Sequence, residues 1–309
     1  MTRFYRLTRR LIEAMEVPDL EIPMAGITLF RKEDSIPGDL LQFSPLNETV
    51  TSCHAARCAT LGDAVYLTEE NIGCIAAAIS LGLVDRDQSV PLEGPRVYTE
   101  IMRENSGRKE DFTPPSPAEF TNGTVYACKD AEREEYALFG RDDSGRYRKR
   151  ETARRATSEM MAIQPPTVQG VFYFSPDFDE VEVLPDIVFM SLRPVELCRV
   201  IQGYQFLTGR RTQADIAGLR AGCSDLIARP YLTGKINFSP YCLGARLIAR
   251  FEADRMGLGI PFSEFEIMVR GTEESKTGFP FPRYPGAVPE KGPGINDVCL
   301  DPVSDRKKG

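Results

Sequence analysis

The 309-residue sequence predicts an α+β protein in which a mixed sheet is covered by helices, with two related halves packed as one compact unit. Segments with helical spacing of apolar residues alternate with short runs rich in β-branched and aromatic residues. These patterns fall in two blocks, residues 1–84 and 167–271, separated by a charged elaboration or insertion at 85–166 and followed by an irregular tail at 272–309. The length suffices for a substantial core, yet lies near the size at which a single core stops growing.

The first block reads as a helix followed by strand, helix, strand and helix. Residues 2–17 carry an apolar stripe at helical spacing, opposite a face of arginines, so they predict an amphipathic helix that ends before Pro18. The alternation in residues 25–32 predicts a short strand, and residues 64–67 predict another. The remaining pattern predicts helices over 47–61 and 73–81, the second stopped by Gly82.

The segment between the blocks is rich in charged and turn-forming residues. Within it, the sequence predicts a helix over 97–104 and a strand over 123–129. The basic run at 145–155 is flanked by acidic residues and has few aromatics, which favours a solvated face over a nucleic-acid site.

In the second block, residues 167–176 and 186–192 predict adjacent strands of one sheet, joined by a turn. A helix follows from Pro194 to Gly209, and Cys198 is expected on its apolar face as a core thiol.

The last ordered segment predicts a helix followed by a strand. Ser239 is expected to cap a helix that presents Leu243, Leu247 and Phe251 on one face. Gly257, Gly259 and Pro261 should end that helix, and residues 265–271 predict the closing strand.

The charge and hydropathy patterns exclude some classes of partner. The net charge of −7 is spread in mixed runs, so no global field favours nucleic acid. No apolar run is long enough to span a bilayer, and the N-terminus lacks a signal core, which predicts a cytoplasmic protein that binds no membrane. The expected partner is a small-molecule ligand or a redox partner, and the oligomeric state is left open.

Eight cysteines are more than packing requires, and in a reducing compartment they are expected to be thiols. No C-x-x-C pair occurs, which argues against a zinc knuckle or a thioredoxin-type motif. Four cysteines fall at or near predicted helix starts, where free backbone N–H groups favour the thiolate. They are Cys53, Cys74, Cys223 and Cys242. Four such thiolates match the ligand count of an iron–sulfur cluster.

Plainer interpretations compete with this one, because a free cysteine is often just a small buried residue. Cys58 lies about 140° around a helix from Cys53 and is expected to point elsewhere. His54 should project away from its neighbour, so a Cys-His dyad is awkward. Asp225, Glu252 and Asp254 are possible acid–base groups, for which surface solvation is the default.

Two stretches resemble the family of domain of unknown function 169. They are CHAARCATLGDAVYLTEENIGCIAAAISLGL at 53–83 and AGCSDLIARPYLTGKINFSPYCLGAR at 221–246, followed by GIP at 259–261. The resemblance covers about residues 22–84 and 167–271 and places the same four cysteines on the family's cysteine positions. Ala76 to Ala78 stand where many relatives carry glycine, and the family's name implies no activity.

Three functional hypotheses follow, and whether the protein is an enzyme is left open. The first is a [4Fe–4S]-like metallocofactor on Cys53, Cys74, Cys223 and Cys242, serving redox or small-molecule chemistry. The second is a metal-free binding module in which Arg229 and Arg246 hold a carboxylate or phosphate as the cofactor-binding residues. The third is thiol catalysis by Cys242.

Overall fold

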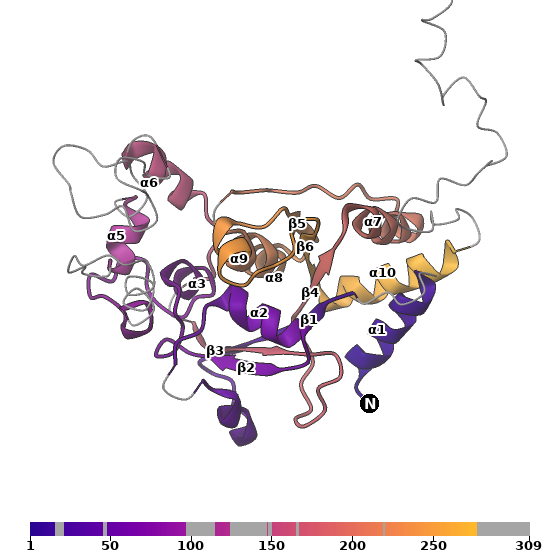
Figure 1. Ribbon diagram of the computed structural model, residues 1–309, viewed down its shortest axis with the longest axis horizontal. Coiled ribbons are helices and arrows are strands. Elements are labelled where there is room, and N and C mark those ends of the chain that lie inside the picture. The colour runs from indigo at the N-terminus through magenta and orange to yellow at the C-terminus, as the bar shows by residue number, and fades with distance from the viewer. Residues whose placement is uncertain are drawn as a thin grey trace, which may run out of the picture.

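A six-stranded sheet forms the centre of the protein (Figure 1). The computed structural model describes residues 1–15, 22–45, 48–96, 115–123, 147, 150–164, 167–218 and 220–276. The strand order is β2-β3-β1-β4-β6-β5. The strands are β1 (Met24–Arg31), β2 (Ala64–Leu67), β3 (Val168–Phe174), β4 (Ile187–Leu192), β5 (Asn237–Ser239) and β6 (Met256–Pro261). Helices surround this sheet, so the predicted α+β class is confirmed.

Neighbouring strands are antiparallel throughout, rather than mixed as expected. The strand β1 occupies the middle because it pairs with β3 along one edge and with β4 along the other. The prediction that 167–176 and 186–192 are adjacent is therefore wrong, since β1 lies between them. Both sequence blocks contribute strands to the one sheet. The proposed relation between the two halves stays a prediction.

Both faces of the sheet are buried, and alternate residues of each strand serve opposite faces. In β1, Ala25, Ile27 and Leu29 pack with one core cluster, whereas Met24 and Phe30 pack with the other. This burial on two sides explains why the central strands read as nearly continuous apolar runs.

The face that carries Ala25 is covered by a group of helices, most of which carry a cysteine or follow directly on one. They are α2 (Ser52–Thr60), α3 (Ile75–Ser80), the π-helix η3 (Ala221–Ala228), α8 (Arg229–Thr233) and α9 (Leu243–Leu247). Figure 1 shows α2, α8 and α9 together over the centre of the molecule. We call this the cysteine face.

The opposite face is covered by α1 (Arg3–Ala14), α7 (Pro194–Thr208) and α10 (Phe262–Glu274), which Figure 1 shows grouped together. The predicted amphipathic stripe of α1 is confirmed, because Phe4, Leu7 and Leu11 are buried. The outer side of α1 is tied to α10, where Arg10 binds Glu273 at 2.6 Å.

Two predictions for the second block are wrong. Residues 265–271 are part of α10, and their buried side chains Phe265, Met268 and Val269 follow helical spacing. The glycine-rich stretch at 256–261 forms β6 instead of ending a helix. Glycine at 259 is required there, because an added Cβ would lie 2.0 Å from the carbonyl oxygen of Leu226.

The helices α7 and α9 also differ in detail from the predictions. The helix α7 ends at Gly209 as expected, yet Cys198 is exposed, because the buried side is formed by residues such as Leu197 and Val200. The helix α9 is shorter than predicted, and Leu247 on it is 68% exposed.

The segment between the blocks contributes α5 (Pro117–Thr121) and α6 (Arg150–Ser158), which Figure 1 places beside α3, away from α1. A 3₁₀ helix, η1 (Gly38–Phe43), follows β1. The predicted helix at 97–104, nearly all of the predicted strand at 123–129 and the tail beyond 276 lie outside the described residues. Within the described ranges, no helix is both long enough and apolar enough to cross a bilayer.

Candidate functional site

Cys53 and Cys74 are brought together by a short junction between two loops. The loop before α2 and the loop before α3 pair through a parallel bridge between Val50 and Ile72. In this bridge the amide of Gly73 donates to the carbonyl of Val50 at 3.0 Å. Cys53 is the second residue of α2, and Cys74 is the N-cap of α3. Both thiols are partly buried against the core of the cysteine face.

Local capping explains the position of Cys53. The side chain of Thr51 accepts a hydrogen bond from the amide of His54 and so begins α2. His54 itself is exposed.

Cys223 lies in the π-helix η3, a conformation that is rare and often found at functional sites. The helix follows Arg220, whose backbone is left-handed with φ of 63°. The Cys223 thiol donates to the carbonyl oxygen of Arg220 at 3.6 Å. Gly222 allows η3 to approach α2 closely, because a Cβ there would lie 2.6 Å from the sulfur of Cys53.

Cys242 is the N-cap of α9 and is buried. It follows Tyr241, a non-glycine residue with φ of 71°. The Tyr241 ring stacks on the Phe251 ring, with centroids 4.6 Å apart. The guanidinium of Arg246 also lies over the Tyr241 ring, 5.0 Å from its centroid. This packing holds an unfavourable backbone conformation just before the thiol.

The four cysteines form one electrostatically coupled group. The charge of a thiolate raises the pKa of the other thiol in each of the six possible pairs among Cys53, Cys74, Cys223 and Cys242. We call these residues the four-thiol group. Cys58 does not share this coupling, since its pKa is raised by burial and then by Asp63.

One thiol of the group is a thiolate at neutral pH. A hydrogen bond from Cys53, together with backbone hydrogen bonds from Ala245, Gly222 and Ala221, lowers the pKa of Cys242 to about 5. The same hydrogen bond, followed by burial, raises the pKa of Cys53 well above its usual value. The pair therefore shares one proton, held on Cys53.

The other two thiols are protonated at neutral pH. Burial raises the pKa of Cys223, and the charges of Cys74 and Cys242 add to this effect. Burial also raises the pKa of Cys74, although hydrogen bonds from the backbone of Ala77 and Ala76 act in the opposite direction.

A tyrosine that the sequence did not single out faces the same group. Tyr173 lies on β3 on the cysteine face, and its hydroxyl is 2.7 Å from that of Ser52. Burial raises its pKa, and the charges of Cys223 and other thiols of the group raise it further. The alternation of side chains along β3 could have pointed to Tyr173 from the sequence, because it places Tyr173 on the same face as Val171.

Asp225 is also close to the group and is buried rather than solvated. Its carboxylate accepts a hydrogen bond from the amide of Ala217 at 3.0 Å. Burial raises the pKa of Asp225 to about 7, and the charges of Asp215 and Cys242 contribute. A carboxyl group with such a pKa can exchange a proton near neutral pH.

The two predicted anion-binding arginines are engaged by protein groups. Arg229 pairs with Asp215 at 2.7 Å, at the surface. Arg246 donates to the carbonyl oxygens of Pro240 at 2.7 Å and Arg255 at 2.8 Å, and also to that of Glu252. Their predicted role in holding a ligand stays a prediction.

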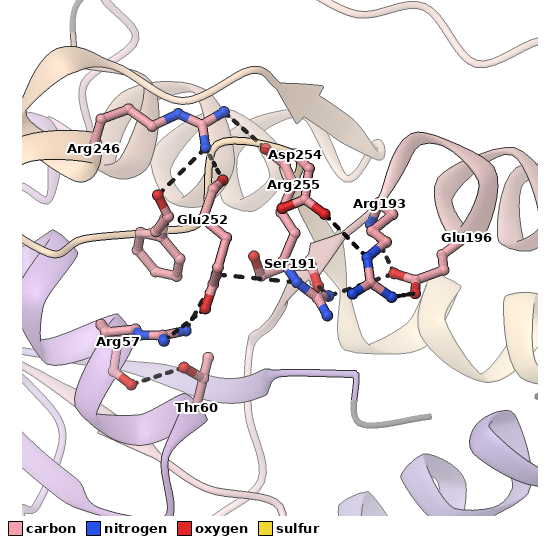
Figure 2. A network of polar contacts seen from close by, with 10 residues as sticks. Arg57, Thr60, Ser191, Arg193, Glu196, Arg246, Glu252, Asp254 and Arg255 are labelled. Carbon is pink, nitrogen blue, oxygen red and sulfur yellow. Dashed lines mark hydrogen bonds and ion pairs between the residues drawn. The ribbon is translucent and has the colours of Figure 1, made fainter. Parts of the chain in front are cut away.

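Figure 2 shows that Arg246 is part of a wider polar network that holds the loop after α9. Glu252 in this loop binds Arg57 of α2 at 2.7 Å, and Arg255 donates to the carbonyl oxygen of Ser191 in β4 at 2.7 Å. Asp254 binds Arg193 at 3.1 Å, so Glu252 and Asp254 serve as ion-pair partners. The network fixes the segment that carries Cys242 against the helix that carries Cys53.

Across the residues described by the structure, no group of three or more His, Cys, Asp or Glu side chains is disposed to hold one ion. Cys128 and Cys299 lie outside those residues.

Comparison with known proteins places the chain in a family. The family model DUF169, described as an uncharacterised ArCR, matches residues 15–271. The uncharacterised protein MJ0308 of Methanocaldococcus jannaschii is 22% identical over 260 residues, which cover 84% of this chain and 90% of that protein. No solved structure matches. Since the match extends over most of the sequence and includes all four cysteines of the coupled group, the chain belongs to the DUF169 family.

Proposed function

We propose that the protein holds a cysteine-ligated metallocofactor of the [4Fe–4S] type on the four-thiol group and uses it for redox or small-molecule chemistry. The observation that carries this proposal is the mutual coupling of Cys53, Cys74, Cys223 and Cys242, which come from four separate segments of the chain. Four cysteine sulfurs are the usual ligand set of such a cluster.

The ligand geometry of a four-iron cluster differs from that of a single metal ion. A lone zinc ion needs its thiolates at about 2.3 Å from one point, and no described group of side chains is disposed to hold one ion. A four-iron cluster binds each cysteine through a different iron atom, and so needs its ligands farther apart.

The surroundings of the sulfurs also suit an anionic cofactor. Backbone groups of Ala221, Gly222 and Ala245 donate hydrogen bonds to the Cys242 sulfur, and those of Ala76 and Ala77 donate to Cys74. Hydrogen bonds to ligand sulfurs stabilise their negative charge and set the reduction potential of a cluster. When bound, such a group would supply one-electron transfer or a site for a substrate.

Loading requires the loss of protons from the group. Cys242 is already a thiolate at neutral pH, whereas Cys53, Cys74 and Cys223 have raised pKa values and must be deprotonated on ligation. Ligation should therefore release about three protons. Cofactor uptake is expected to weaken as the pH falls.

The test is iron and acid-labile sulfide analysis after anaerobic purification and reconstitution. Cys242→Ser should lose the cofactor, since serine keeps the shape of the side chain but not the soft ligand. Cys198→Ser is the matched control, because Cys198 is an exposed thiol on α7. A wild-type protein that stays iron-free, or a Cys242→Ser variant that retains full iron, would refute the proposal.

Thiol catalysis by Cys242 is a second candidate, supported by its pKa of about 5. A thiolate of this kind can attack an electrophilic carbon or a disulfide, and Cys53 could return a proton to the leaving group. Mass spectrometry after brief alkylation at neutral pH distinguishes this role. An iron-free protein in which Cys242 reacts fastest would favour it over the cluster.

A further inference from the structure

The chain segment that carries Cys242 is bounded by two residues in an unusual backbone conformation. Tyr241 has a φ of 71° and Arg250 has a φ of 55°, and neither is a glycine. This left-handed conformation is unfavourable for a residue with a Cβ atom. It persists only where surrounding contacts impose it, and it is found at ligand clamps and switch regions. Residues 242–249 therefore lie between two strained points of the chain, and we call them the Cys242 segment.

The two ends of the Cys242 segment lie close together. The ring of Tyr241, at one end, stacks on that of Phe251, just beyond the other, with centroids 4.6 Å apart. A segment of this length whose ends meet resembles an Ω-loop, a compact surface loop that is frequently functional. Because its ends meet, the Cys242 segment can swing as one unit without displacing β5 and β6, the strands before and after it.

One side chain of the Cys242 segment fastens it to the chain on both sides. Arg246 donates to the carbonyl oxygen of Pro240 at 2.7 Å, before the segment. It also donates to the carbonyl oxygens of Glu252 and, at 2.8 Å, of Arg255, both after the segment (Figure 2). All three acceptors lie outside the two strained residues. The guanidinium therefore acts as a latch that holds the segment against its own base.

Apart from this latch, little apolar surface holds the Cys242 segment in place. Among its described side chains, the buried ones are small, namely Cys242, Ala245 and Ala249, whereas Leu247 is 68% exposed. Hydrophobic stabilisation scales with the apolar area removed from water, so these side chains contribute little. Segments with few buried apolar contacts are the ones that open locally, at a lower free energy than global unfolding.

We propose that the Cys242 segment is a lid over the four-thiol group, hinged at Tyr241 and Arg250 and latched by Arg246. Opening releases the strain at both hinges, and the hydrogen bonds of the latch oppose it. Because the lid carries Cys242, opening withdraws this thiol from the group and gives a ligand access to the buried thiols. The lid belongs to the protein itself and does not depend on which group the thiols hold.

Native-state hydrogen exchange of the apo protein measures the opening. The amides of Arg246 and Ile248 donate within the Cys242 segment, to the carbonyl oxygens of Cys242 at 3.1 Å and Gly244 at 2.9 Å. They should be at least about tenfold less protected than the amides of β4 and β6. In low urea their exchange should hardly change, because lid opening exposes little surface, whereas exchange in β4 and β6 should accelerate steeply. Equal protection and equal urea dependence in both sets would overturn the lid.

Two variants should shift the opening in opposite directions. Arg246→Ala removes the latch, so the protection of the lid amides should fall at least about tenfold. Arg250→Gly relaxes one hinge at an exposed side chain, which favours the closed lid, so the protection should rise about threefold. Arg10→Ala is the matched control, because Arg10 binds Glu273 through two hydrogen bonds on the opposite face of the sheet. It should leave the lid amides unchanged.

Alkylation with iodoacetamide connects the lid to the thiols. Labelling of Cys242 should accelerate in Arg246→Ala and slow in Arg250→Gly by the same factors as the exchange, and should hardly respond to low urea. Labelling of Cys198, which is exposed on α7, should be equal in all the proteins. If Arg246→Ala does not fold, Arg250→Gly and the wild type still decide. Cys242 labelling that follows urea as the β4 and β6 amides do, or that ignores the folded variants, would refute the gating role.

Discussion

Gly222→Ala tests whether the close approach of η3 to α2 holds the four-thiol group together. An added Cβ at Gly222 would lie 2.6 Å from the sulfur of Cys53. Favourable contacts between such atoms begin at about 3.5 Å, so the sulfur must move by about 1 Å. Rotation about the Cα–Cβ bond of Cys53 would relieve the clash, and we expect the displaced sulfur to lose its hydrogen bond to Cys242.

The effect on stability should be small. Overpacking costs about 1–3 kcal/mol, and replacing glycine by alanine in a helical segment returns about 0.5–1 kcal/mol. The variant should therefore be destabilised by about 0–2.5 kcal/mol, which thermal unfolding can measure. The site should change much more, because the hydrogen bond from Cys53 is the largest cause of the lowered pKa of Cys242.

Gly244→Ala is the matched control on the other side of the group. A Cβ at this position would lie 3.8 Å from the sulfur of Cys242, which is an ordinary contact. We expect Gly222→Ala to lose iron and sulfide. In the apo protein, it should also raise the pKa of Cys242, which a pH titration of thiolate absorbance measures. Gly244→Ala should behave as wild type. If both variants retain full cofactor and the same Cys242 pKa, the reasoning about this contact is wrong.

Three further predictions follow from the same contacts. In the apo protein, Cys53→Ala should raise the pKa of Cys242 above about 5, because it removes the thiol that donates the largest stabilising hydrogen bond; the pH dependence of alkylation measures this. Burial raises the pKa of Asp225 from 3.8 to about 7, so the stability that the neutral carboxyl contributes is present below about pH 4 and is lost as the pH rises through 7. Asp225→Asn should remove this loss of unfolding free energy between pH 4 and 7, as denaturant titrations between pH 4 and 8 would show. An equal loss in the wild type and the variant would contradict the prediction. Arg246→Ala should lower the unfolding free energy by about 2–3 kcal/mol, since it removes charge-assisted hydrogen bonds to several carbonyl oxygens. A loss under about 0.5 kcal/mol would show that the loop after α9 keeps its conformation without these hydrogen bonds.

Much of the first block could be predicted from the sequence, because its signals are local. The stripe of α1, the strand at 64–67 and the cap at Thr51 depend on residues a few positions apart. The errors fell where local signals are ambiguous. The stretch at 256–261 contains glycines that weaken a strand pattern, and short apolar runs such as 265–271 fit either a strand or a helix.

For the site, the sequence by itself determined which cysteines stand at or near the starts of helical segments, because capping and helix-breaking residues act within a few positions of the chain. Only the tertiary structure decided that Cys53, Cys74, Cys223 and Cys242 lie close enough to be electrostatically coupled, since their approach depends on β1 lying between β3 and β4 and on the fit of Gly222 against α2. The burial of Asp225, the placement of Tyr173 and the position of Arg220 were likewise decided there. A side chain's charge state depends on neighbours that are distant in the chain, and no local pattern of residues specifies them.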